Sequence, residues 1–260
     1  MKWLTPFLIV VWFASPGFAT WSIVAVDPST GQIVIASATC VAQARFATFP
    51  AEGLMDIQAV VVPGKGIAAA QAGIDRTRAN QTLISEELRK GTAPIDIVSK
   101  LRQDTDIDTR QFGIVDMEGR SAGHSGTENG RASLDVQGRV SGTDIVYSIQ
   151  GNILASEDVI HDAVTAFEKT DGAVADRVIA AMEAADAAGG DRRCTCDTEP
   201  LTEAPCNGKT SHVAYILEAD ATTPEGQSTL YIDVTDDNIE PHENANPVKT
   251  LRMRYDAHEP

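Results

Sequence analysis

Short apolar runs separated by polar turns mark the first part of the chain. Residues 20–26 and 32–39 are mostly apolar at consecutive positions, and a Pro- and Gly-containing loop at 27–31 joins them, a composition typical of a hairpin. The runs 57–62 and 66–72 repeat this arrangement. Because strands that are apolar on both faces must be covered on both sides, these segments predict a sheet inside a layered fold.

Helical spacing of apolar residues is found further along the chain. Leu83, Ile84 and Leu88 lie on one side of a helix predicted at 75–90, which Gly91 ends. Other helices are predicted at 94–103, after the capping residue Ser156, and at 173–188. Further strands are predicted at 111–117, 120–125, 144–154, 212–218 and 229–234.

The order of these elements, in which strand pairs alternate with helix pairs, predicts an α+β fold. Two stacked sheets would each carry a helical layer on the outside, which gives a four-layer αββα arrangement. We expect one domain at 20–235, because no repeat or long linker interrupts it, and an acidic surface tail at 236–260.

Residues 1–19 have the pattern of a secretory signal peptide. A mainly apolar segment at 4–13 follows a positively charged start, and Gly17 and Ala19 are the small residues that signal peptidase requires. Cleavage after Ala19 would make Thr20 the first residue of a periplasmic or secreted protein. The alternatives are cleavage after Gly17 and an uncleaved anchor, but the apolar segment is short for a permanent span, and no later segment approaches about 20 apolar residues.

Composition narrows the range of partners. The net charge of −16 argues against nucleic acids and anionic membranes, because neither would meet a basic surface. A hydrophobic content of 43% is ample for a folded core. We therefore expect a small molecule or a peptide as partner, with homo-oligomers left open and no stable membrane insertion after signal cleavage.

Four cysteines in an exported chain indicate disulfides. A bond between Cys194 and Cys196 would be cramped, since a single residue separates them. We expect one of these two to bond Cys206 and the other to bond Cys40.

Metal and cofactor motifs are weak. A zinc site at the cysteines would need His212 or His124 as a fourth ligand, and the cysteine spacing is poor for zinc. Five scattered histidines make no other metal motif, and the sequence has no glycine-rich phosphate loop. We expect no metal and no cofactor.

A threonine at a free amino terminus carries a nucleophile and a base in one residue. The Thr20 hydroxyl can attack an acyl carbon, and the α-amine, with an unperturbed pKa of about 7.7–8.0, can accept its proton at neutral pH. The alternative is that a threonine merely follows the cleavage site.

Other polar residues could complete such a site. The oxyanion formed by the attack needs hydrogen-bond donors, and Asn152 is the first candidate, with Gln71 second. Asn152 could instead end a strand, and Gln71 could be a buried core amide. Ser37, on the neighbouring strand, could relay a proton or serve only in packing.

Charged residues supply candidates for substrate binding. Arg45 could lower the pKa of the amine or bind a substrate carboxylate, and it could equally be a solvated loop residue. Asp191 and Arg193, which follow two glycines, could bind substrate or form a local ion pair.

Several motifs in order along the chain resemble a bacterial family of unknown function, DUF1028, whose members look like Ntn (N-terminal nucleophile) hydrolases. These motifs are Thr-Trp-Ser-Ile-Val-Ala-Val-Asp at 20–27, Ala-Ser-Ala-Thr at 36–39, Gln-Ala at 71–72, Arg-Gln-Phe-Gly-Ile-Val-Asp at 110–116, Gln-Gly-Asn at 150–152 and Gly-Gly-Asp-Arg-Arg at 189–193. The resemblance implies the four-layer αββα Ntn fold. It implies no substrate. The signal peptide and the cysteine-rich insertion after Arg193 depart from the family pattern.

The chemistry of Thr20 and this resemblance together predict an exported Ntn-type amidohydrolase. Its substrate would be a small amide, such as a peptide, an N-acyl compound or a cell-wall fragment. A non-catalytic secreted binding protein on the same fold is the main alternative, and a disulfide-stapled structural protein of the envelope is a third.

Overall fold

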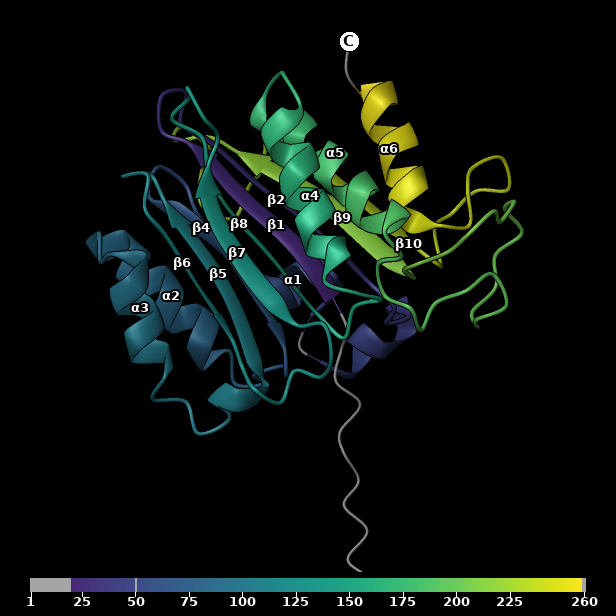
Figure 1. The fold of residues 1–260 in the computed structure, drawn as a ribbon, viewed down its shortest axis with the longest axis horizontal. Coiled ribbons are helices and arrows are strands. Elements are labelled where there is room, and N and C mark those ends of the chain that lie inside the picture. Colours follow the sequence, from purple (N-terminus) through teal and green to yellow (C-terminus); the bar gives the residue numbers. More distant parts are fainter. Residues whose placement is uncertain (1–19, 50, 259–260) are drawn as a thin grey trace, which may run out of the picture.

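Residues 20–49 and 51–258 are described by the computed structural model, and two antiparallel sheets form the centre of this part of the chain (Figure 1). The larger sheet has the strand order β10-β9-β2-β1-β8-β7, and the smaller has the order β3-β4-β5-β6. The larger sheet is made of β1 (Thr20–Asp27), β2 (Gln32–Thr39), β7 (Leu134–Arg139), β8 (Val146–Asn152), β9 (Val213–Ala219) and β10 (Leu230–Thr235). The smaller is made of β3 (Ala59–Val62), β4 (Gly66–Ala72), β5 (Arg110–Asp116) and β6 (Ser121–Ser125).

Strand β1 lies inside the larger sheet, and its two faces belong to different layers. Ile23 and Ala25 are fully buried in a cluster with residues of the helices, whereas Val24 and Val26 are fully buried between the two sheets. A strand without a solvent face needs apolar residues at consecutive positions. The prediction of a doubly covered sheet is therefore confirmed.

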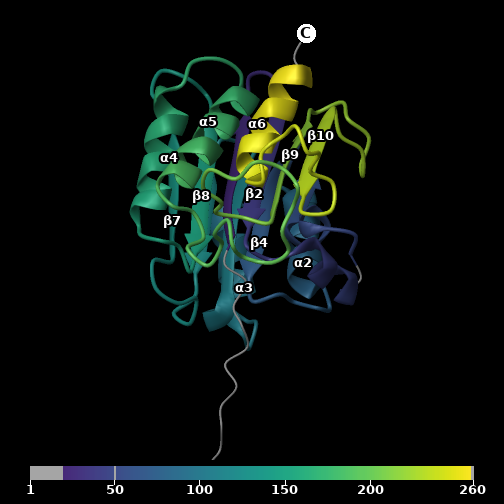
Figure 2. The same ribbon diagram turned by 90° about the vertical axis from the view of Figure 1, so that its right-hand side faces the viewer.

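Helices cover the outer face of each sheet (Figures 1 and 2). Helices α2 (Ala79–Lys90) and α3 (Pro94–Leu101) pack on the smaller sheet. Helices α4 (Asp158–Lys169), α5 (Val174–Ala187) and α6 (Pro247–His258) pack on the larger sheet. The expected α+β class with two antiparallel sheets is confirmed.

The strand expected at 57–62 is shorter in the structure, because the connection between β2 and β3 extends into it. This connection contains a 3-10 helix, η1 (Gln43–Thr48), and a short helix, α1 (Leu54–Gln58), so only residues 59–62 are a strand. The Asp56 carboxylate accepts hydrogen bonds from the main-chain N–H groups of Glu52 and Gly53 at 2.9 and 3.1 Å. These bonds satisfy donors at the start of the helix, which favours α1 over a longer strand.

Two further elements differ from the prediction, α2 in its first residue and β7 in its presence. Helix α2 begins at Ala79 and not at Asp75, because the Asp75 carboxylate accepts the N–H groups of Thr77 and Asn80 and makes a turn before the helix. Strand β7 was not predicted from the pattern, since its residues are half-buried and form no apolar run. A second 3-10 helix, η2 (Ile107–Thr109), precedes β5.

The expectation of a surface tail at 236–260 is wrong for most of that segment. Helix α6 buries Val248, Leu251 and Tyr255 in the same cluster as α4 and α5. Arg254 binds the helix to β10, because it donates to the Asp233 carbonyl at 2.9 Å and pairs with Glu243 at 2.7 Å. The acidic composition of the segment concealed a helix with five buried residues, of which three belong to the apolar core cluster.

Replacement of a buried residue of α6 should therefore destabilise the whole domain. Leu251 is fully buried, so Leu251→Ala should lower the free energy of unfolding by about 2–5 kcal/mol. Met253 on the same helix is 44% exposed, and Met253→Ala should change it by less than about 0.5 kcal/mol. Urea denaturation of both variants measures the difference, and equal effects would show that α6 is not part of the core.

Candidate functional site

Thr20 is the first residue of β1 and lies at the end of the larger sheet. The strand register pairs it with Thr39 on β2 and with Asn152 on β8. Its side chain faces the layer between the sheets, where the Thr20 Oγ1 hydroxyl donates to Thr39 Oγ1 at 3.3 Å. Thr20 is only 2% exposed in the full chain.

Gln71 reaches Thr20 from the smaller sheet. Its Nε2 amide donates to the main-chain carbonyl of Thr20 at 3.2 Å and to Gln111 Oε1 at 2.7 Å. Its Oε1 accepts from Ser22 Oγ at 2.6 Å and from Gln58 Nε2 at 2.5 Å. Gln71 therefore lies beside the candidate nucleophile, but its contacts are those of a buried positioning amide that holds the backbone of Thr20.

The contacts of Gln71 are part of a larger network between the sheets. Gln111 Nε2 donates to the Gly151 carbonyl at 2.8 Å, and Gln150 Nε2 donates to Ser22 Oγ at 2.5 Å. Gly113 makes room for Gln150, because a Cβ at that position would lie 2.0 Å from Gln150 Oε1. We define the amide network as Ser22, Gln58, Gln71, Gln111 and Gln150.

Among these five residues, the sequence pointed to a role only for Gln71, and the other four belonged only to motifs or predicted strands. Gln58, Gln111 and Gln150 are each 1% exposed or less. In the sequence, each of them is an amide inside an otherwise apolar segment. Such an amide is expected to be buried and therefore to need hydrogen-bond partners. Which partners they meet depends on how the two sheets face each other.

Two other candidates for catalysis lie close to Thr20. Asn152 is its direct neighbour on β8 and is 1% exposed. Ser37 lies on β2, but its hydroxyl donates to the Trp21 carbonyl at 2.7 Å. That hydrogen bond directs the Ser37 proton to the main chain and not toward Thr20, which favours the packing interpretation of Ser37.

The glycine pair and the ions after it lie near the same end of β1. Gly190 packs directly on Trp21, because a Cβ at position 190 would lie 2.7 Å from its ring. The fully buried Asp191 pairs with Arg193, with 2.7 Å between Oδ2 and Nη2. The structure thus shows the local ion pair that was one of the two expectations. Arg45 is exposed on η1 and does not line the pocket at Thr20.

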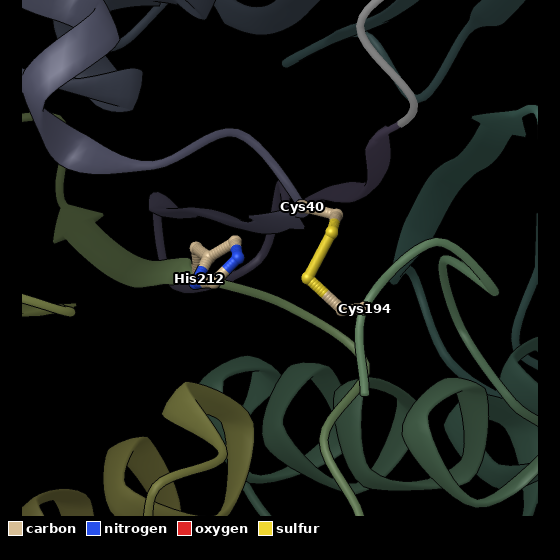
Figure 3. Close-up of side chains that lie close together, drawn as sticks. All are labelled: Cys40, Cys194 and His212. Atoms are coloured by element: carbon tan, nitrogen blue, oxygen red, sulfur yellow. A yellow bond between two sulfur atoms is a disulfide. The ribbon is translucent and has the colours of Figure 1, made fainter. Parts of the chain in front are cut away.

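Two disulfides join the described cysteines, Cys40 to Cys194 and Cys196 to Cys206. This is the expected pattern, and the structure selects Cys194 as the partner of Cys40. The bond ties the end of β2, one residue after Thr39, to the loop that contains Asp191 (Figure 3).

The disulfides also indicate the kind of cellular compartment in which the protein is found. Such bonds are typical of proteins in oxidising compartments outside the cytosol, such as the bacterial periplasm. Across 20–49 and 51–258, the structure contains no helix with the length and apolar character needed to cross a bilayer. The expected signal peptide at 1–19 lies outside the described residues.

His212 lies beside the Cys40–Cys194 bond (Figure 3). It is 2% exposed, and its Nδ1 atom has no hydrogen-bond partner within the described part of the chain. Burial, together with the nearby positive charge of Lys209, lowers its pKa to about 4. His124 is on β6, where its ring stacks on Phe112, and it is not part of this group.

A small pocket opens beside Thr20. Its cavity volume is about 20 Å³, and Thr20, Thr39, Gln58 and Gln71 supply its polar lining. Seven apolar residues make the rest of the wall: Val41, Phe46, Leu54, Ile57, Ala70, Ala72 and Ile74. A nucleophilic hydroxyl at the edge of a mainly apolar pocket, with amides behind it, is an arrangement suited to acyl transfer.

Comparison with known proteins supports the resemblance seen in the motifs. The model of a family described as "Family of unknown function (DUF1028)" matches residues 20–198. The crystal structure of protein SPO2555 from Silicibacter pomeroyi, itself described with DUF1028, is similar, with a TM-score of 0.66 and 23% sequence identity over 92% of this chain and 85% of that chain. At this identity the likeness shows the fold alone. No curated protein matches the chain.

The pKa of His212 predicts a loss of stability in mild acid. The unfolded chain takes up a proton as the pH falls through the ordinary value of 6.5, whereas the folded chain does so only near 4. The free energy of unfolding should therefore fall by roughly 3 kcal/mol over this window. His212→Asn should remove that slope, as measured by urea denaturation at several pH values. Parallel pH profiles for the two proteins would contradict the assignment.

Proposed function

The chain belongs to DUF1028, a family of unknown function, and we propose that its mature form is an exported Ntn-type amidohydrolase with Thr20 as the nucleophile. The proposal includes signal cleavage after Ala19, which would free the α-amine of Thr20. It also takes the two sheets and their outer helices as the four-layer αββα sandwich of the Ntn hydrolases.

The observation that carries the proposal is the position of Thr20. It begins a central strand of the larger sheet, and its hydroxyl lies at the edge of a pocket. Thr39, Asn152 and Gln71 surround it from three different strands. Such a position, for the residue that the proposed cleavage would expose, supports a role for its free amine and hydroxyl together.

The proposed reaction has two acyl-transfer steps. In the first, Thr20 Oγ1 bonds to the amide carbon, its proton passes to the α-amine, and the C–N bond breaks as the departing nitrogen takes that proton. In the second, water attacks the resulting ester, gives a proton to the amine and releases the acid, which restores the Thr20 hydroxyl. The amine acts as base and then as acid, so no third protein group is needed for proton transfer.

Among the expected oxyanion donors, Asn152 fits this reaction better than Gln71. The register places Asn152 directly beside Thr20 on β8. Gln71 already donates to the Thr20 carbonyl and to Gln111, so its donors hold the backbone in place. We propose Asn152 as the donor to the oxyanion and Gln71 as a positioning residue. Arg193, paired with Asp191, remains a proposal for binding substrate at the rim.

The test begins with the first residue of the exported protein, established by intact mass and N-terminal sequencing. Protein that begins at Thr20 should release p-nitrophenol from p-nitrophenyl acetate and form an acetyl ester on Thr20. Hydroxylamine should remove this ester, since it cleaves esters and spares amides. Thr20→Ala should lower kcat/KM by at least about 10³-fold, and Thr20→Ser should retain most of it.

A matched control carries one additional alanine before Thr20. It keeps the hydroxyl but converts the amine into a peptide bond, so it should lose activity as fully as Thr20→Ala. Activity in this extended protein would contradict the role of the amine. An exported protein that begins elsewhere and forms no ester on Thr20 would favour the non-catalytic binding protein.

A further inference from the structure

The larger sheet extends beyond the smaller one at β9 and β10. The smaller sheet has four strands against six and packs mainly on β1, β2, β7 and β8. On the same face, β9 is covered by the connection between β2 and β3, because Phe46, Leu54 and Ile57 of that connection share a core cluster with Val213 and Tyr215. The connection does not fill all of this space, and a cavity remains between α1 and the two strands.

This cavity, which we call the β10 cavity, is large enough for a small organic molecule. Its volume is about 180 Å³, and a cavity of roughly 150 Å³ in another protein holds benzene. The connection forms one side of the wall. Tyr231, Asp233 and Thr235 form another, because alternate residues of β10 face the same way.

Three carboxylates belong to the wall of the β10 cavity, and no cationic side chain does. They are those of Glu52, Asp56 and Asp233. Among the ion pairs of the described residues, none includes any of these three. Arg254 reaches the main-chain carbonyl of Asp233 from α6, but its guanidinium pairs with Glu243. The cavity therefore has a negative wall without a cation of its own.

An aromatic ring borders the same cavity. Tyr231 is 43% exposed, and its ring lies 6.4 Å from that of Tyr215 between centroids. Burial raises the pKa of the Tyr231 hydroxyl, and the charges of Asp233, Asp56 and Glu52 raise it further. The three carboxylates thus act together at this ring. A tyrosine face attracts cations, so the ring and the carboxylates favour the same kind of ligand.

The carboxylates surround a volume and do not converge on a point. Among the described residues, the only group of three His, Cys or acidic side chains with ligand atoms within 4.8 Å of one another is Cys40, Cys194 and His212. A calcium site needs about six to eight oxygen ligands around one ion. Leu54 and Met55 add apolar surface to the wall. This combination fits a cation that carries carbon better than a metal ion.

Gln43 supplies a further polar atom to the wall. Its Nε2 donates to the Glu52 carbonyl at 2.7 Å, whereas its Oε1 is buried and has no hydrogen-bond partner in the part of the chain that the structure describes. Buried acceptors normally have a donor. An ammonium group brings three N–H donors and no acceptor, so it complements both this oxygen and the carboxylates.

We propose that the β10 cavity binds an organic cation, a primary ammonium group on a short aliphatic chain. The ammonium would lie among Glu52, Asp56 and Asp233, with the chain against Leu54 and the Tyr231 ring. The cavity shares Leu54 with the pocket at Thr20. Binding requires no reaction at Thr20, so this inference does not depend on the proposed function.

Titration of the exported protein with n-butylammonium chloride tests the inference. Saturation-transfer NMR of the ligand protons measures the affinity, and a Kd of the order of 1 mM is expected for a ligand of this size. Neutral n-butanol and anionic n-butyrate have the same number of carbons and are the matched ligands. Each should bind at least about tenfold more weakly, because neither brings a positive charge to the carboxylates.

Variants that keep the shape of the wall locate the binding. Asp233→Asn and Glu52→Gln each remove one charge from the cavity and should each weaken n-butylammonium binding by about threefold to tenfold. Asp171→Asn is the control, because Asp171 is exposed, lines none of the pockets described above and loses the same charge. Asp56 is left intact, since its carboxylate accepts the N–H groups at the start of α1.

Each outcome supports or overturns the inference. Selective binding of n-butylammonium that Asp233→Asn weakens and Asp171→Asn does not would support it. Equal binding of n-butanol, equal effects of the two aspartate variants, or no binding at about 50 mM would overturn it. Displacement of n-butylammonium by an equal concentration of Ca²⁺ would assign the site to a metal ion instead. Thr20→Ala should bind n-butylammonium as the unchanged protein does, so failure of the proposed function is detected separately.

Discussion

The amide network between the two sheets is the interaction on which the site depends. A sheet face buried against another sheet is normally apolar, and here Val24, Val26, Ile33 and Ile35 follow that rule. At the Thr20 end the same interface is polar, and Gln71 and Gln111 connect β4 and β5 to β1 and β8. Buried amides tolerate few relative positions of their partners, because each unsatisfied group costs about 1–3 kcal/mol. The network therefore fixes the position of one sheet on the other. Through the hydrogen bond to the Thr20 carbonyl, it also fixes the direction in which β1 begins.

Three constraints from distant parts of the chain meet at this point. The Cys40–Cys194 bond spans 154 residues and holds the end of β2 against the loop after Asp191. Gly190 permits that loop to approach the ring of Trp21. The connection with η1 and α1 closes the other side with apolar residues. The proposed mature protein would begin at Thr20, and chain ends often fray; these contacts hold the start of β1 in place.

Much of the fold follows from local patterns. The strands near 20–26, 32–39 and 66–72 and the helices near 94–103 and 173–188 match closely, because both their burial and their ends are visible in the sequence. Helix α6 and strand β7 do not follow in this way. Only three residues of α6 belong to the apolar core cluster, and no residue of β7 is fully buried, so neither has a strong periodic signal. The pattern of apolar residues is informative only where burial is nearly complete.

By itself, the sequence determined the α+β class, the family and the cysteine pairs up to one ambiguity, and it singled out Thr20 as the candidate nucleophile. Each of these depends on residue type and order. Tertiary structure decided that Cys194 and not Cys196 meets Cys40, that Ser37 donates to the Trp21 carbonyl, and that Gln71, Gln111 and Gln150 form one network. It also decided that Arg45 lies outside an uncharged pocket. Hydrogen bonds and pockets depend on the distance between side chains that are far apart in sequence, and that distance exists only once the two sheets have packed together.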